Sequence, residues 1–571
     1  MESPFASRLG TTFIPSDEEV VEIRKILDEQ IPKLAHISSE LARVKALYEE
    51  LENQHKQLVD DMDAHRKLLS LPRRNLLPTD VLQEIFLSCL PINHDSIITK
   101  KEAPILLTQV CGSWRRIALN TPLLWASIHI PINPPFLRAA GDETATDLRM
   151  MRRVTAVRQW LSRSKNCPLS FTFGTNPNTV GPYRHCDDII SLLLLQLTRW
   201  RRVSVSAPKY YVAMFMALDG RQMPLLESIT IRDLGEGGSS WSPQAPAVTN
   251  AEICSSQLSL FENPNLRILS VSYLTQDICS LSVKWAALSH LSLYHNLGPV
   301  EVPQIFDLLK SCTRLVNFKL GAQFYMFTPI PSSNQQTFQS SVGTVVSLPF
   351  LENFSLYYHT EVVYPEIFDS LELPALQEIN YQWTHRSSAQ PPLLSLLRKQ
   401  GHSITTLTTN IEFFSEENFR SCLCCCPHLK KLIIATLRTP RMNGNESTRT
   451  TDTDLLESFS SPSSSGEYLC PELEVLESSI ATVSSDQDVL DFLARKQAGT
   501  LPGLSKMKSL GLVFSREQKQ PMAEFVRPYI EEGLDLGLAY RFLDDRGISV
   551  YDHLPIDLDV LPERSPGPAL F

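Results

Sequence analysis

The sequence lacks several features that would place it in common classes of protein. No run of about eighteen apolar residues occurs, so we expect no helix that spans a membrane. Basic residues are outnumbered, with 53 Lys and Arg against 63 Asp and Glu and a net charge of −10, which argues against nucleic acid as the main partner. Glu2 stands where a secretory signal would be basic, and no apolar segment follows it. We therefore expect a protein of the cytoplasm or the nucleus, with neither membrane nor nucleic acid among its partners.

Motifs for catalysis, cofactors and metals are also missing. There is no GxGxxG or Walker-type loop, no GxSxG and no HExxH. The twelve cysteines sit mostly inside apolar patterns at irregular spacing, which is typical of reduced, buried thiols. The cluster Cys422, Cys424, Cys425, Cys426 and His428 lacks a second ligand pair at zinc spacing and lacks a base that would activate a nucleophile. We expect no catalytic residue, no cofactor and no metal.

What is present indicates a folded chain of several units. Hydrophobic residues make up 43% and charged residues 20% of the composition. A length of 571 residues is too great for one ordinary core and indicates two to four structural units.

Residues 16–70 are expected to form a coiled-coil helix, because a seven-residue repeat runs through them. Position a holds Val20, Leu27, Leu34, Leu41, Tyr48, His55, Met62 and Leu69, and position d holds Ile23, Gln30, Ile37, Val44, Leu51, Leu58 and His65. Pro32 should break or kink the helix, which leaves Lys33–Leu69 as the convincing part. Two interpretations remain: a homodimer through residues 33–69, weakened by Tyr48 and His55 in the seam, or a helix that folds back on its own chain.

Residues 71–130 contain two short amphipathic helices. Pro78 suits a first helical position, and Asp80 and Glu84 place negative charge in the first turns. The first helix has an apolar face of Val81, Leu82, Ile85, Phe86 and Leu90, and the second one of Leu107, Val110, Cys111, Trp114, Ile117 and Ala118. So few apolar residues make a marginal core, so part of this face should meet a partner.

Three phrases in this region carry a resemblance to a known family. They are Leu-Pro-x-Asp-Val-Leu-x-Glu-Ile-Phe from Leu77, Val-Cys-x-x-Trp-Arg-Arg-Ile-Ala from Val110, and Thr-Pro-x-Leu-Trp from Thr121. In this order they resemble an F-box, the helical module that docks substrate receptors onto the Skp1 subunit of cullin-RING ubiquitin ligases. The long polar link Pro91–Lys101 departs from the pattern. The preceding coiled coil, ending in Asp63–Leu69 and Arg73-Arg74, is similar to that of many fungal F-box proteins.

The resemblance implies a set of contact residues and partners. Skp1 would bind the face that carries Leu77, Pro78, Val81, Leu82, Ile85 and Phe86, with Val110 and Trp114 completing the helical support. Through this Skp1-like adaptor the chain would reach a cullin.

Residues 131–197 are expected to bridge to the remainder of the chain with a basic amphipathic helix, Leu148–Lys165, and a strand, Pro168–Phe173. The six basic residues in that helix could attract phosphate or an acidic partner, although such a run is more often a solvated face.

Residues 198–545 repeat the pattern apolar-x-x-apolar-x-apolar eleven times. The units begin at Trp200, Leu226, Leu266, Leu288, Leu315, Leu351, Leu376, Ile404, Leu429, Leu473 and Met507. Their shorter steps lie near the 20–29 residues of leucine-rich repeats, and the longer ones hold insertions at 233–250, 321–345 and 438–466. We expect an α/β solenoid, an irregular leucine-rich-repeat horseshoe closed by a helix over 522–532 and an apolar segment over 534–542, followed by a tail over 546–571. The phrases that begin at Cys426-Pro427 and Cys470-Pro471 resemble the repeats of F-box proteins.

The resemblance to an F-box, together with the repeats, implies a non-catalytic substrate-recognition subunit of an SCF-type ubiquitin ligase, with an unknown protein substrate on the repeats. Two other classes compete. A non-degradative coiled-coil and repeat scaffold would bind no Skp1-like adaptor, and a hydrolase or transferase on an α/β fold would need a deep polar pocket.

Overall fold

The computed structural model describes most of the chain, as two compact units, Met1–Ser88 and Cys89–Phe571. The described residues are 4–11, 13–74, 77–132, 143–175, 184–234, 259–272, 278–295, 301–323, 345–359, 368–383, 391–411, 414–435, 450–451, 455–462, 466, 468–482, 484–498, 503–514, 516–543 and 549–553. The three predicted insertions and the predicted tail lie mostly outside this set.

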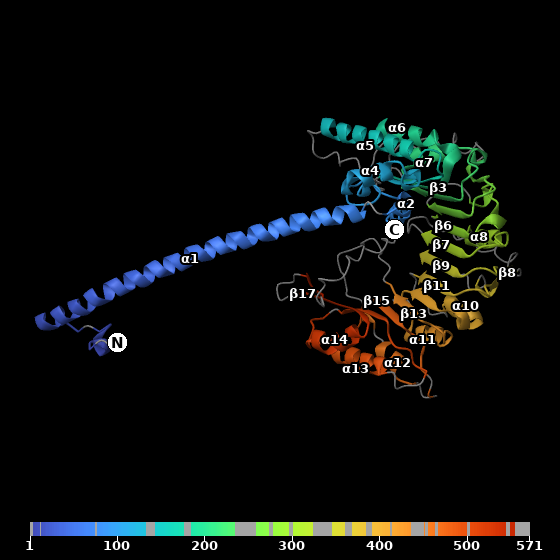
Figure 1. Cartoon of the computed structure of the whole chain (residues 1–571). Coiled ribbons are helices and arrows are strands. Elements are labelled where there is room, and N and C mark those ends of the chain that lie inside the picture. Colours follow the sequence, from blue (N-terminus) through green and yellow to red (C-terminus); the bar gives the residue numbers. More distant parts are fainter. Residues whose placement is uncertain are drawn as a thin grey trace. The chain divides into compact units, whose positions relative to one another are not determined.

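The first unit is helical and contains η1 (Ala6–Arg8), α1 (Asp17–Arg74) and α2 (Thr79–Ser88). α1 begins with a reciprocal cap, in which the Glu19 N–H donates to Ser16 Oγ (3.5 Å) and the Ser16 N–H donates to Glu19 Oε2 (2.9 Å). Its 58 residues correspond to a length of about 87 Å. The predicted N-terminal helix is confirmed (Figure 1).

The predicted break at Pro32 is wrong, because α1 runs unbroken from Asp17 to Arg74. Proline removes only the hydrogen bond to the carbonyl four residues earlier, that of Asp28. Asp28 and Pro32 are both exposed, so water can satisfy that carbonyl. The remaining turns hold the helix together across this position.

The second unit combines short helices with one long sheet. Its α-helices are α3 (Leu107–Val110), α4 (Gly112–Leu119), α5 (Glu143–Arg163), α6 (Arg184–Leu194), α7 (Lys209–Met216), α8 (Glu301–Leu309), α10 (Pro392–Gln400), α11 (Glu416–Cys424), α12 (Leu455–Ser460), α13 (Asp486–Gln497) and α14 (Met522–Glu531). Its 3-10 helices are η2 (Pro122–Trp125), η3 (Leu197–Arg199), η4 (Gly220–Gln222), η5 (Ser259–Phe261), η6 (Ile278–Ser280), η7 (Trp285–Ala287) and η9 (Gly401–Ser403).

The sheet has 16 strands, in the order β1-β2-β3-β4-β5-β6-β7-β9-β11-β12-β13-β15-β16-β17-β18, with β14 beside β15. The strands are β1 (Ser127–Ile132), β2 (Leu169–Thr175), β3 (Trp200–Ala207), β4 (Ser228–Asp233), β5 (Ile268–Ser272), β6 (His290–His295), β7 (Asn317–Gln323), β9 (Asn353–His359), β11 (Glu378–Trp383), β12 (Thr406–Thr409), β13 (Lys431–Ile434), β14 (Thr450–Thr451), β15 (Val475–Thr482), β16 (Ser509–Phe514), β17 (Asp535–Leu543) and β18 (Ser549–His553). A separate pair joins β8 (Val346–Ser347) to β10 (Leu371–Glu372). Every neighbouring pair is parallel except β17 and β18.

The register of the sheet follows the predicted repeats. The second apolar residue of each unit pairs with its counterpart in the next unit, and all eleven are buried. They are Val203, Ile229, Leu269, Leu291, Phe318, Phe354, Ile379, Leu407, Leu432, Leu476 and Leu510. A one-residue slip would turn these side chains to the opposite face, so their pattern fixes the pairing. The eleven predicted strands are confirmed, and helices α7, α8, α10 and α11 lie along one side of the row of strands (Figure 1).

Both ends of the sheet extend beyond the predicted repeats. β1 continues it within residues 71–130, so the expectation that this region is entirely helical is wrong, and β2 continues it within the predicted bridge, whose helix is confirmed as α5. At the other end α14 and β17 confirm the closing helix and the apolar segment, and β18 forms where a tail was expected to begin. Of the described helices, none combines the length and the apolar content that crossing a bilayer requires.

Candidate protein-docking surface

α2 presents two apolar sides, of which one is buried and one is exposed. Leu82 and Phe86 are buried, with 4% and 0% of their surface exposed. Leu77, Val81 and Ile85 are exposed at 43%, 43% and 40%, and Pro78 before the helix is exposed as well. Val81 and Ile85 are four residues apart and so lie on the same side of α2, while Leu77 lies just before the helix begins. Of the six predicted contact residues in this segment, the structure therefore leaves Leu77, Pro78, Val81 and Ile85 accessible to a partner.

The second predicted helix forms as α3 and α4 with Cys111 between them. The thiol of Cys111 caps α4 by accepting a hydrogen bond from the Trp114 N–H (3.4 Å). Val110 is exposed at 43% and Trp114 is half-buried, whereas Ala118 is buried. Val110 can therefore meet a partner, while Trp114 lies partly within the fold.

The segment Thr121–Trp125 connects α3 and α4 to the first strand, β1. The Trp125 indole N–H donates to the Ala118 carbonyl (2.9 Å) and its ring meets that of Trp160 edge to face, with centroids 4.8 Å apart. The Arg163 guanidinium lies 4.6 Å from the Trp125 ring centroid. Trp125 is completely buried, so this last part of the F-box-like sequence supports the fold.

The polar link Pro91–Lys101 is held against the same end of the sheet. The Asp95 carboxylate accepts hydrogen bonds from the hydroxyls of Ser127 on β1 (2.7 Å) and Thr172 on β2 (2.6 Å). Ile97 forms a parallel bridge with His129, which covers part of the outer edge of β1. The departure from the family pattern thus has a structural role in this chain.

The polar face of the sheet carries a second candidate surface, a row of residues that we call the polar row and that is uncharged except for Lys319. Each consecutive strand of the main sheet from β1 to β12 contributes one residue, which is paired with its counterpart in the next strand. Among these residues Lys319 is the only Lys, Arg, Asp or Glu. The row is His129, Thr172, Ser204, Thr230, Ser270, Ser292, Lys319, Ser355, Asn380 and Thr408. Such a surface favours hydrogen bonding to a protein segment over binding of a strongly charged ligand.

Beside this row, two tyrosines flank a glycine. Tyr294, Gly321 and Tyr357 are paired across β6, β7 and β9, and the two rings have centroids 6.0 Å apart. A Cβ on Gly321 would lie 2.3 Å from Tyr294 Cδ1, so glycine leaves room for the ring. The Asn380 amide donates to the Tyr357 hydroxyl (2.8 Å), and burial raises the pKa of Tyr357. Sequence analysis missed this patch, although a glycine between tyrosines in adjacent repeats was a usable signal.

Several thiols of the predicted cysteine cluster, and that of Cys470 from the next repeat, are buried. Burial raises the pKa of Cys422 to about 12 and that of Cys470 to about 12, which disfavours the thiolate that metals and electrophiles need. His428 Nδ1 lies 2.7 Å from a carboxylate oxygen of Glu472. Within the described residues, no group of three or more His, Cys, Asp or Glu side chains could hold a metal ion.

Lys496 is a buried cation near these thiols. Only 1% of its surface is exposed, and its ammonium donates to the Leu473 carbonyl (3.2 Å). Burial lowers the pKa of Lys496 to about 8, because the charged form loses its hydration. The folded state therefore carries this charge at a cost.

Lys496→Met is expected to stabilise the fold by about 1–3 kcal/mol at pH 7, since it replaces a buried charge by an apolar chain of similar length. Below pH 8 Lys496 of the wild type is protonated in both the folded and the unfolded state, so the free-energy cost of burying its charge is fully present. Between pH 8 and about 10.4 the folded state releases the proton first, so wild-type stability rises and the advantage of the variant fades. Urea unfolding at pH 7 and at pH 10 would measure this difference. Arg495→Met, which removes an exposed charge from the same helix, is the control, and an equal effect of both variants would contradict the prediction.

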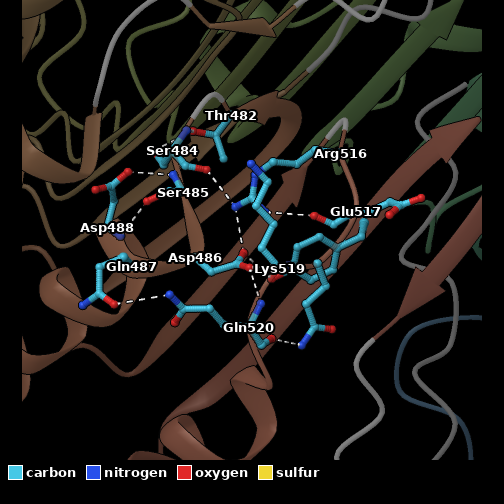
Figure 2. Close-up of polar contacts among 12 residues, drawn as sticks. Thr482, Ser484, Ser485, Asp486, Gln487, Asp488, Arg516, Glu517, Lys519 and Gln520 are labelled. Atoms are coloured by element: carbon cyan, nitrogen blue, oxygen red, sulfur yellow. Dashed lines mark hydrogen bonds and ion pairs between the residues drawn. The ribbon is translucent and has the colours of Figure 1, made fainter.

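The polar cluster around Asp486 closes the C-terminal end of the sheet (Figure 2). Its carboxylate, 2% exposed at the start of α13, accepts hydrogen bonds from Arg516 Nη2 (2.7 Å), the Tyr540 hydroxyl (3.0 Å) and the N–H groups of Lys519 (2.7 Å) and Gln520 (3.1 Å). The Arg516 guanidinium lies 4.7 Å from the ring centroid of Phe514, which stacks on Tyr540. All four contacts on the carboxylate are internal, so this cluster joins strands and loops of the fold.

The described residues thus include an exposed apolar stretch on and just before α2, the exposed Val110 in the second unit, and a polar row on the sheet in which Lys319 is the one charged member. In comparisons with known proteins, no protein-family model and no curated protein matches this chain.

Proposed function

We propose that this chain is a substrate-recognition subunit of an SCF-type ubiquitin ligase, acting in the cytoplasm or the nucleus. The observation that carries the proposal is an exposed apolar stripe, formed by Val81 and Ile85 on α2 and by Leu77 just before it, within the sequence motif that resembles an F-box. Exposed apolar stripes on short helices mark protein-binding surfaces, because leaving them in water is unfavourable. The stripe and Val110 would contact a Skp1-like adaptor, while the buried Leu82 and Phe86 would stabilise the packing of α2.

In this proposal the chain performs no chemistry of its own. A conjugating enzyme held by the cullin would transfer ubiquitin, and the chain would bring the substrate near it. A leucine-rich-repeat solenoid would present the polar row and the patch around Tyr294 and Tyr357 to that substrate. Loops of the three insertions would add selectivity, as binding loops on a rigid scaffold commonly do.

Ile85→Asp and Val81→Asp are each expected to weaken adaptor binding by about 30-fold or more, since each buries a charge where an apolar contact forms. Loss of a central contact residue typically costs about 2 kcal/mol or more. The measurement is titration of the full-length protein with a purified Skp1 protein. Leu225→Asp is the matched control, because Leu225 is also 43% exposed but lies on the second unit before β4.

Two results would count against the ligase proposal. Wild-type protein that binds no Skp1 protein would exclude it, as would equal binding by the wild type and Ile85→Asp. The alternative, a non-degradative scaffold that joins partners through the helix and the repeats, predicts the first of these results.

A further inference from the structure

α1 carries an apolar seam that is exposed along most of its length. The apolar residues at heptad positions a and d between 34 and 62 are 47–67% exposed. They are Leu34, Ile37, Leu41, Val44, Tyr48, Leu51, Leu58 and Met62. A narrow seam of this kind on one long helix is the surface that a second helix covers in a coiled coil.

Charges beside the seam recur with a period that specifies one partner. Position g is acidic at three places and position e is basic at three places, each series spaced by 21 residues, or three heptads. The acidic residues are Glu19, Glu40 and Asp61, and the basic residues are Arg24, Lys45 and Arg66. Each basic residue follows its acidic counterpart by five positions, which is the spacing of residues that meet across a parallel, in-register coiled coil. In such a pair, the acidic residue at position g of one copy would lie opposite the basic residue at position e of the other copy. This would occur at all three places along the helix and on both sides of the apolar seam.

Other arrangements of two α1 helices lose this complementarity. A parallel pair staggered by one heptad would place Lys33 opposite Lys45 and Glu40 opposite Glu52 of the second copy. An antiparallel pair overlapping over residues 30–69 would place Glu40 opposite Asp61 and Lys45 opposite Glu52 of the second copy, so that repulsive and attractive contacts offset each other, whereas the parallel in-register pair has attractive contacts at all three places. Like charges at such positions destabilise a pairing, so the flanks favour one orientation and one register.

We propose that α1 pairs in parallel and in register with α1 of a second copy of this chain. The pairing covers the apolar seam and joins two substrate-binding sheets in one particle. It does not depend on the adaptor contact of α2, so each can fail without the other.

The test uses two full-length variants whose charges are complementary only to each other. Glu40→Lys and Lys45→Glu each create like-charge pairs on both flanks of a homodimer, so each is expected to weaken self-association about tenfold. In a mixed dimer of a Glu40→Lys chain and a Lys45→Glu chain, position 40 of each chain faces an opposite charge at position 45 of the other. We expect the mixture to regain the affinity of the wild type within about threefold. Sedimentation equilibrium of each protein, and capture of one tagged variant by the other, measure this.

Arg43→Ala is the matched control, because Glu40 also forms an ion pair with Arg43 within its own helix (3.3 Å). This variant removes that pair without changing an e or g position, and we expect self-association to stay within about twofold of the wild type. Circular dichroism would verify that every variant keeps its helix. A monomeric or tetrameric wild type would overturn the proposal. So would a mixture no tighter than the single variants, or a Glu40→Lys variant that associates more tightly, as an antiparallel pair requires.

Discussion

Trp125→Ala is expected to lower the local stability of the first strands by about 3–5 kcal/mol, the usual cost of removing a buried tryptophan. The side chain is completely buried and its indole N–H satisfies the Ala118 carbonyl. Its ring also meets Trp160 and the guanidinium of Arg163. Truncation would leave a cavity where η2 joins α4 to β1.

Hydrogen exchange measures this effect better than global unfolding, because a long sheet of repeats can open in parts. Amides of β1 and β2 should exchange faster in Trp125→Ala, while those of β12 and β13 serve as an internal reference. Trp125→Phe keeps a ring but loses the hydrogen bond, so an intermediate effect is expected. Leu123→Ala, at an exposed position of the same 3-10 helix, should change exchange little. Equal exchange in Leu123→Ala and Trp125→Ala would show that the tryptophan does not anchor this end.

The sequence was sufficient to predict the strands because their signal is local and repeated. Each unit supplies its own apolar residues, and stacking only places like positions side by side, as with Phe318 and Phe354. Pro32 shows where a local rule failed. Losing one helical hydrogen bond at an exposed carbonyl that water can satisfy costs less than ending a helix of 58 residues, so α1 continues.

The candidate sites could be predicted only in part, because they depend on which side of an element is covered. Helical periodicity placed Val81, Leu82, Ile85 and Phe86 on one wide apolar face. Burial divides that face, leaving Val81 and Ile85 exposed and Leu82 and Phe86 covered. No pattern within α2 alone carries that division, since it follows from what packs against the helix.

Contacts between segments that are distant in the sequence could not be predicted for a similar reason. Asp486 and Arg516 come from two different repeats and Tyr540 from the closing segment, and no sequence motif links the three. Their meeting depends on the lengths of the loops between α13, β16 and β17, which no motif encodes.

Asp486→Ala is expected to lower the local stability of the C-terminal strands by about 3 kcal/mol, at the low end for a broken buried pair because Arg516 is partly exposed. The substitution leaves four donors without their acceptor: the Arg516 guanidinium, the Tyr540 hydroxyl and the N–H groups of Lys519 and Gln520. Hydrogen exchange of β16 and β17 measures the loss. Tyr540→Phe removes one donor and should cost about 1 kcal/mol. Asp488→Ala, at a half-buried capping residue two positions away, should cost about 1 kcal/mol as well.

The same carboxylate should make this end of the sheet sensitive to acid. Burial alone would raise the pKa of Asp486, but the hydrogen bonds from Arg516, the Lys519 N–H and Tyr540 outweigh it and lower the pKa below its usual value. A folded pKa below the unfolded one means that the stabilisation is fully present above about pH 4 and is lost as the pH falls through the folded value. Exchange in β16 and β17 should therefore rise in acid relative to that in β3 and β4, after correction for the intrinsic rate. In Asp486→Ala this extra acid dependence should be absent, because no carboxylate remains to be protonated. An unchanged acid dependence in that variant would assign it to another group.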